Sequence, residues 1–174
     1  MSNSYDDVMA RRSDIMRQAL ALDYDRFQHG DLVFDYDALM SSTGYRLDDV
    51  ARIQAETKVG HTPLYELHRL TEAVREIAGP GKGARILLKD EAANASGSFK
   101  ARRASLSAHE AQVKGFAGMV TATSGNYGAA VASQAAQRGL ACIVIQEIYD
   151  SQHVGQPEIV EKSRACEAYG AEVI

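Results

Sequence analysis

The chain has 174 residues, of which 45% are hydrophobic and 24% charged, as expected for one ordinary globular domain. Its formal net charge is -4 and its basic residues form no run longer than a pair, which gives no general basis for binding nucleic acid. No signal-peptide pattern, membrane span or metal-ligand spacing of cysteine or histidine occurs, so we expect a cytoplasmic protein without a membrane partner or metal.

The N-terminal segment, residues 1–57, is helical in pattern. Apolar residues recur at helical spacing from Val8 to Leu20, which predicts an amphipathic helix. A turn-prone stretch follows, and residues 46–56 have the pattern of a second, short helix. Because this segment has little apolar surface, we expect an N-terminal helical extension and not a separate domain.

From residue 58 the pattern changes to alternating helices and strands. Short apolar strands are predicted at 85–89, 118–122, 140–146 and from 171 onward. Helices are predicted before the glycine-rich turn at 79–83, and at 98–114, 127–138 and 157–169. This order predicts an α/β fold with a parallel sheet covered by helices on both faces. Because the last strand begins and stops at Ile174, we expect residues 58–174 to be the N-terminal part of a larger, truncated domain.

A polar loop joins the strand at 85–89 to the following helix. Within it, Ser98 is a plausible N-cap, which places Lys100 in the first helical turn. The positive end of the helix dipole disfavours a second positive charge there. The neutral amine of such a lysine could attack a carbonyl, although position alone favours an ordinary solvated helix lysine.

A second polar loop, Ser-Gly-Asn-Tyr-Gly at residues 124–128, joins a strand to a helix. Its glycines allow close backbone approach, and free N–H groups at a helix start can bind a carboxylate. A tight turn that requires glycine explains the pattern equally well. Alone, residues 59–64 (VGHTPL) predict an extended segment, and residues 79–83 (GPGKG) predict a turn and not a phosphate loop, because they precede a strand.

Together, the strings GHTPL (60–64), NASGSFK (94–100) and TSGNYG (123–128) resemble the fold-type II, tryptophan-synthase-β-like enzymes that depend on pyridoxal phosphate. The resemblance covers about residues 57–174. It implies a pyridoxal 5'-phosphate cofactor bonded to a catalytic Lys100, with Asn126 contacting the cofactor's 3' oxygen, and Asn94 and Ser98 holding the lysine loop. It also implies that the substrate carboxylate is bound by Ser124, Gly125, Tyr127 and Gly128.

Three longer strings, KDEAANASGSFKARRAS, ATSGNYGAAVASQAA and VGQPEIVEKSRACEAYGAEV, are most similar to the family of 2-amino-4-ketopentanoate thiolase β subunits. This resemblance implies an acyltransferase of ornithine degradation. It would cleave 2-amino-4-ketopentanoate with coenzyme A, giving acetyl-CoA and alanine, together with an α subunit and as a homo-oligomer.

Other functions remain open from the sequence. A lyase that eliminates or replaces the β substituent of serine, threonine or diaminopropionate, or a threonine synthase-like enzyme, would use the same lysine. A non-catalytic piece is a further alternative, because no glycine-rich loop for the cofactor phosphate follows Gly128 before Ile174. The resemblance places that loop and the partner of the pyridine nitrogen further along the chain, and the isolated piece is expected to be inactive.

Overall fold

The computed structural model describes residues 4–30, 33–149 and 151–174. Residues 1–3 and 31–32 of the predicted extension, and residue 150, lie outside the described residues. Contacts divide the chain into two compact units, Met1–Leu47 and Asp48–Ile174, and each is described by itself. The expected division after residue 57 stays a prediction.

The first unit contains short elements only. They are α1 (Tyr5–Ala10), α2 (Arg12–Leu20), the 3-10 helix η1 (Tyr24–Phe27), β1 (Gln28–His29), β2 (Val33–Phe34) and α3 (Tyr36–Ser42). Two helices replace the single predicted one, because the backbone of Arg11 (φ -103°, ψ 6°) interrupts the helical path. The α3 helix lies in the stretch expected to form turns. Its N-cap is Asp35, whose Oδ1 accepts a hydrogen bond from the Ala38 N at 2.8 Å.

An aromatic cluster packs within this unit. The ring centroids of Phe34 lie 4.6 Å from Tyr24, 6.2 Å from Phe27 and 4.9 Å from Tyr36. Tilted and edge-on arrangements at these distances are favourable for aromatic rings. The antiparallel pair β1 and β2 brings Phe34 to this position, opposite Gln28.

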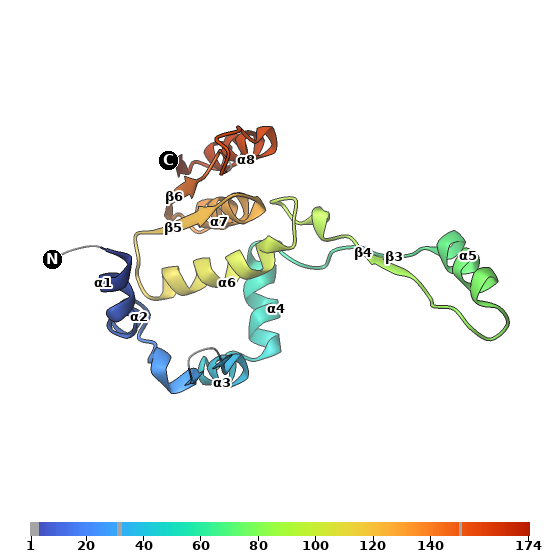
Figure 1. The fold of residues 1–174 in the computed structure, drawn as a ribbon, viewed down its shortest axis with the longest axis horizontal. Coiled ribbons are helices and arrows are strands. Elements are labelled where there is room, and N and C mark those ends of the chain that lie inside the picture. Colours follow the sequence, from blue (N-terminus) through green and yellow to red (C-terminus); the bar gives the residue numbers. More distant parts are fainter. Residues whose placement is uncertain (1–3, 31–32, 150) are drawn as a thin grey trace. The chain divides into compact units, whose positions relative to one another are not determined.

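The second unit alternates helices and strands, as predicted (Figure 1). Its elements are α4 (Leu47–Glu56), β3 (Leu64–Glu66), α5 (His68–Ala78), β4 (Leu87–Lys89), the 3-10 helix η2 (Glu91–Ala93), α6 (Lys100–Val113), β5 (Gly118–Thr123), α7 (Asn126–Gln137), β6 (Ala141–Gln146), α8 (Pro157–Ala168) and β7 (Glu172–Val173). None of the helices in the described ranges is long and apolar enough to cross a membrane.

The central sheet is parallel, with strand order β5-β6-β7. This confirms the predicted α/β fold. The strand expected at 85–89 does not join this sheet, because β4 pairs antiparallel with β3 in a separate two-stranded sheet. Gly79, Gly81 and Gly83 all have positive φ, and the turn they form lets the chain return beside β3 after α5.

Small side chains form the core between the central sheet and its helices. The α7 helix packs on β5 and β6 and lies between α6 and α8 (Figure 1). The core residues are Ala104, Ala129, Ala130, Val131, Ala132, Ala135, Cys142, Val144, Cys166 and Ala171. On the opposite face of the sheet, Val120, Ile145 and Ile174 are 67%, 48% and 67% exposed, so within the described residues the helices cover one face.

Gly128 allows α7 to lie directly on the sheet. A Cβ added at this residue would lie 2.6 Å from Thr123 Cγ2 and 2.9 Å from Val144 Cγ1. Both distances are below van der Waals contact, so a side chain here would push the helix away from the strands. Gly128, the second glycine of the polar loop, is therefore required for the packing of α7 on the sheet.

We expect Gly128→Ala to lower the free energy of unfolding by about 1–2 kcal/mol, since the overpacking cost exceeds the gain in helix propensity. Urea denaturation followed by circular dichroism measures the change. Gly155→Ala is the matched control, because its Cβ would meet Tyr149 at an ordinary 3.6 Å. Equal stability of the two variants would contradict the packing role of Gly128.

Candidate active site

The loop between β4 and α6 places Lys100 at the start of a helix. Gly97 turns the chain toward α6 with a φ of 74°. Phe99, and not the predicted Ser98, is the N-cap residue of α6, and the Phe99 side chain makes no capping hydrogen bond. Ser98 Oγ accepts a hydrogen bond from the Lys100 N at 3.3 Å, within a tight turn in which the Ala101 N donates to the Ser98 O.

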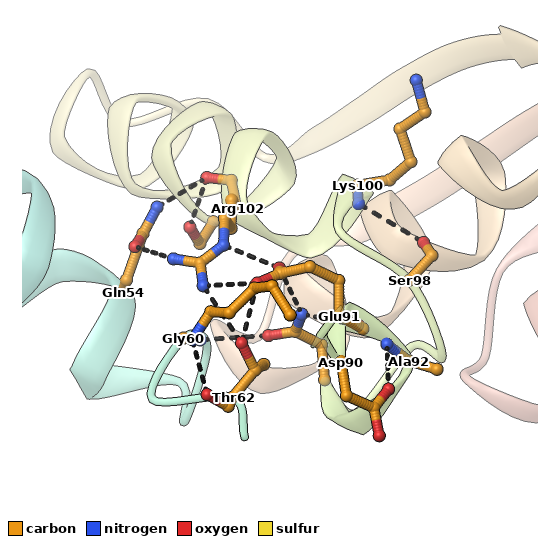
Figure 2. A network of polar contacts seen from close by, with 12 residues as sticks. Gln54, Gly60, Thr62, Asp90, Glu91, Ala92, Ser98, Lys100 and Arg102 are labelled. Carbon is orange, nitrogen blue, oxygen red and sulfur yellow. Dashed lines mark hydrogen bonds and ion pairs between the residues drawn. The ribbon is translucent and has the colours of Figure 1, made fainter. Parts of the chain in front are cut away.

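The carboxylate of Glu91 is the centre of a polar network beside this loop (Figure 2). Arg102 donates to both of its oxygens, from Nε at 2.7 Å and from Nη2 at 2.8 Å. Thr62 Oγ1 donates to Oε1 at 2.7 Å, and Asn94 Nδ2 donates to Oε2 at 3.1 Å. Glu91 and Arg102 therefore form a bidentate ion pair, the geometry in which a guanidinium binds a carboxylate most strongly.

The network joins four segments of the second unit. The buried Asn94 accepts a hydrogen bond at Oδ1 from the Gly60 N at 3.0 Å, and its Nδ2 also donates to the Glu91 O at 2.9 Å. Gln54 of α4 donates from Nε2 to the Arg102 O at 3.2 Å. These contacts connect α4, the segment before β3, η2 and α6, and they agree with the predicted role of Asn94 in holding the lysine loop.

The ion pair strongly affects the protonation of both partners. Hydrogen bonding to Arg102 is the largest cause that lowers the pKa of Glu91 from 4.5 to about 2, ahead of the opposing effect of burial and the hydrogen bonds from Thr62 and Asn94. The same bond raises the pKa of Arg102. Both groups are thus charged throughout the physiological range.

Lys100 points away from this network (Figure 2). Its Nζ lies 4.6 Å from the centroid of the Phe99 ring, and Phe99 itself is 57% exposed. The Lys100 residue is half-buried. Its role as the catalytic, cofactor-bonding residue stays a prediction.

The second polar loop lies between β5 and α7. Ser124 and Asn126 are exposed, Gly125 and Tyr127 are half-buried, and Gly128 is buried against the sheet. The Gly125 N donates to Thr123 Oγ1 at 3.0 Å, and a Cβ added at Gly125 would meet nothing within 4 Å. No described side chain caps the N-terminus of α7, so its first N–H groups are open to an anionic ligand.

Side-chain contacts bring the two loops together. Arg103, one turn after Lys100, lies with Cζ 4.8 Å from the Tyr127 ring centroid, and α6 packs along α7. At the C-cap of α8, the Tyr169 hydroxyl donates to the Ala95 O at 2.9 Å and so contacts the lysine loop. The first turns of α6 and α7 therefore pack against each other, through Arg103 and Tyr127.

The groups in this region suit an anionic ligand that carries a reactive carbonyl. Lys100 supplies a primary amine, Asn126 a carboxamide, and α7 an uncapped N-terminus. Ser96 Oγ, in the lysine loop, is enclosed and has no hydrogen-bond partner among the described residues. An enclosed hydroxyl without a partner is rare in folded proteins and fits a site completed by a further polar group.

Glu91 and Arg102 are site residues that the sequence pattern does not single out. Their importance depends on a contact across 11 positions of an irregular loop, which helical or strand periodicity does not reveal. Thr62 lies in the string GHTPL, which contributes to the resemblance but predicts no contact of Thr62 with Glu91. A carboxylate and an arginine that flank a polar loop are the signal that could have suggested the pair.

The stability of the chain should depend on pH through Glu91. Folding lowers the pKa of Glu91 from 4.5 to about 2, so the ionised carboxylate stabilises the fold at pH values above 4.5. This contribution is lost as the pH falls from 4.5 toward 2. We expect the unsubstituted chain to exceed Glu91→Gln in unfolding free energy, with a difference that shrinks between pH 4.5 and 2. Urea titrations at several pH values measure it. If the difference in unfolding free energy did not change with pH, the lowered pKa of Glu91 would be contradicted.

Two curated relatives match almost the whole chain. A 2-amino-4-ketopentanoate thiolase β subunit from an unknown prokaryotic organism is 60% identical over 98% of the chain, and one from Acetoanaerobium sticklandii is 57% identical over 98%. In each comparison the chain spans 36% of the length of the relative.

A solved structure and a family model agree with these matches. The crystal structure of a cysteine synthase from Entamoeba histolytica is 31% identical with a TM-score of 0.54, over 68% of this chain and 33% of that one. The model of the pyridoxal-phosphate dependent enzymes matches residues 55–174, which include both polar loops. The chain belongs to the family of pyridoxal-phosphate dependent enzymes.

Proposed function

We propose that this chain carries the reactive lysine of an enzyme that cleaves 2-amino-4-ketopentanoate with coenzyme A, forming acetyl-CoA and alanine. The observation that carries the proposal is the 60% identity, over 98% of the chain, to a relative named as the β subunit of that thiolase. Lys100 would bond pyridoxal phosphate, Asn126 would contact its 3' oxygen, and substrate would lie at the loop of Ser124, Gly125, Tyr127 and Gly128.

The residues present are chemically suited to this cofactor. Lys100 at the start of α6 supplies an amine, and the start of α7, which Arg103 of α6 contacts at Tyr127, supplies an open glycine loop and an uncapped helix end. These groups support binding of an aldehyde beside an anion. When bound, pyridoxal phosphate supplies an aldehyde for amines and a ring that takes up electrons from the substrate. The chain's own residues would then hold the substrate and move its protons.

The reaction balances with a thiol as the second reactant. The coenzyme A sulfur bonds the C4 carbon of the ketone, the C3–C4 bond breaks, and its electron pair stays on C3. The thiol loses one proton and C3 gains one, so that C3 becomes the methyl group of alanine. The amine of Lys100 would take up and return a proton near the amino carbon, and the open N–H groups of α7 would orient the carboxylate.

A partner subunit is part of the proposal. Both relatives are named as β subunits, which supports an α subunit as the partner of this chain. Binding of coenzyme A, association with further copies of the chain and a cytoplasmic location stay predictions.

Treatment of the chain with pyridoxal phosphate and then borohydride should label Lys100, because it begins α6, which packs along the helix that follows the open loop. Peptide mapping by mass spectrometry locates the label. Lys82, exposed in the turn after α5, serves as an internal reference and should react more slowly. Lys100→Arg should remove the main labelled peptide without changing the circular dichroism spectrum. Preferential labelling of another lysine would contradict the role of Lys100.

The protein, assayed together with its partner subunit, should form acetyl-CoA and alanine from 2-amino-4-ketopentanoate and coenzyme A. Lys100→Arg should abolish this activity. Release of ammonia from serine, threonine or diaminopropionate, without acetyl-CoA formation from the ketone, would instead favour a lyase.

A further inference from the structure

The first turn of α6 presents two cationic side chains in opposite directions. Successive residues of an α-helix are rotated by about 100°, so positions 100 and 102 are about 200° apart around the axis. Arg102 points into the Glu91 network, and Lys100 points away from it (Figure 2). The direction of Lys100 is therefore linked to the direction of Arg102 by the helix geometry.

The contacts of Arg102 fix the rotation of this turn. Its guanidinium makes two hydrogen bonds to Glu91, at 2.7 and 2.8 Å, and its carbonyl accepts one from Gln54. Glu91 is held in turn by Thr62 and Asn94. A bidentate guanidinium–carboxylate pair restricts orientation as well as distance, which a single point contact does not.

The charges of the same turn favour this arrangement. Lys100, Arg102 and Arg103 all lie near the N-terminus of α6, where the helix dipole disfavours cations. The carboxylate of Glu91 compensates Arg102, and the ring of Tyr127 lies under Arg103. The pair thus allows a cation-rich turn to begin a helix at the site.

We propose that Glu91 and Arg102 are positioning residues that fix the direction of the Lys100 amine, on the side of α6 away from their own network. They act through the backbone of α6 and the lysine loop, and they contact none of the reacting atoms. The inference rests on the proposed function of Lys100, since an orientation matters only if this amine reacts.

The test measures the rate at which pyridoxal phosphate and borohydride label Lys100 in Glu91→Gln, Arg102→Gln and the double variant. The matched control is Glu66→Gln, which breaks an ion pair to Arg85 of similar length, 2.6 Å, away from the lysine loop. Labelling of Lys82 in the same samples corrects for general differences in amine reactivity. Amide hydrogen exchange of residues 92–100 reports on the loop without any cofactor.

We expect both single variants to label Lys100 at least about fivefold more slowly than the unsubstituted chain, and the double variant to be no slower than the slower single one, because the two residues act as one unit. Glu66→Gln should change the rate by less than about twofold. Exchange in residues 92–100 should rise in the Glu91 and Arg102 variants only. Arg102→Lys, which keeps the charge but not the bidentate geometry, should give an intermediate rate.

Two failures can be told apart. If Lys100 is labelled in the unsubstituted chain at a rate that Glu91→Gln and Arg102→Gln leave unchanged, the positioning role is overturned and the proposed function stands. If Lys100 is not preferentially labelled in the unsubstituted chain, the proposed function fails, and the positioning role fails with it. Circular dichroism verifies folding, and if the glutamine variants are unfolded, an unchanged rate in Arg102→Lys overturns the positioning role.

Discussion

Glu91 accepts hydrogen bonds from Thr62, Asn94 and Arg102, which come from three separate segments, and these contacts determine how the chain around Lys100 is held. Without the carboxylate, the arginine would lie among polar groups at the positive end of α6 with no opposite charge. With it, the donors of all three segments converge on two oxygen atoms. The order of an irregular loop thus depends on one charged group and not on regular secondary structure, which is why substitution of a single residue would affect several segments at once.

The other requirement of the fold is close packing of α7 on the sheet. Alanine and glycine allow the helix to approach β5 and β6, and Cys142 and Cys166 fill the remaining space as small apolar groups. Burial raises the pKa of both thiols, which suits this packing role and disfavours the reactive thiolate. The short distance between helix and sheet sets where the start of α7 lies, and Asn126 is the first residue of that helix.

Most of the fold of residues 58–174 could be predicted because its elements have strong local signals. Apolar runs identified β5 and β6, and glycines marked the ends of the helices. The pairing of β4 could not be predicted, since partner and direction depend on the path of the chain after α5 and not on the strand itself. For the site, the polar loops were found from their composition and resemblance, whereas Glu91 and Arg102 were not, because an ion pair from η2 to α6 across an irregular loop leaves no periodic pattern.

The buried position of Ala101 gives the spacing between Lys100 and Arg102 a further meaning. Ala101 is 1% exposed and lies between two long side chains that leave the helix on different sides. Inserting or deleting one residue here would turn one side chain by about 100° relative to the other and would also remove the small residue from its packed position. The three residues therefore form a unit of fixed length, in which the number of residues matters as much as the side chains of Lys100 and Arg102.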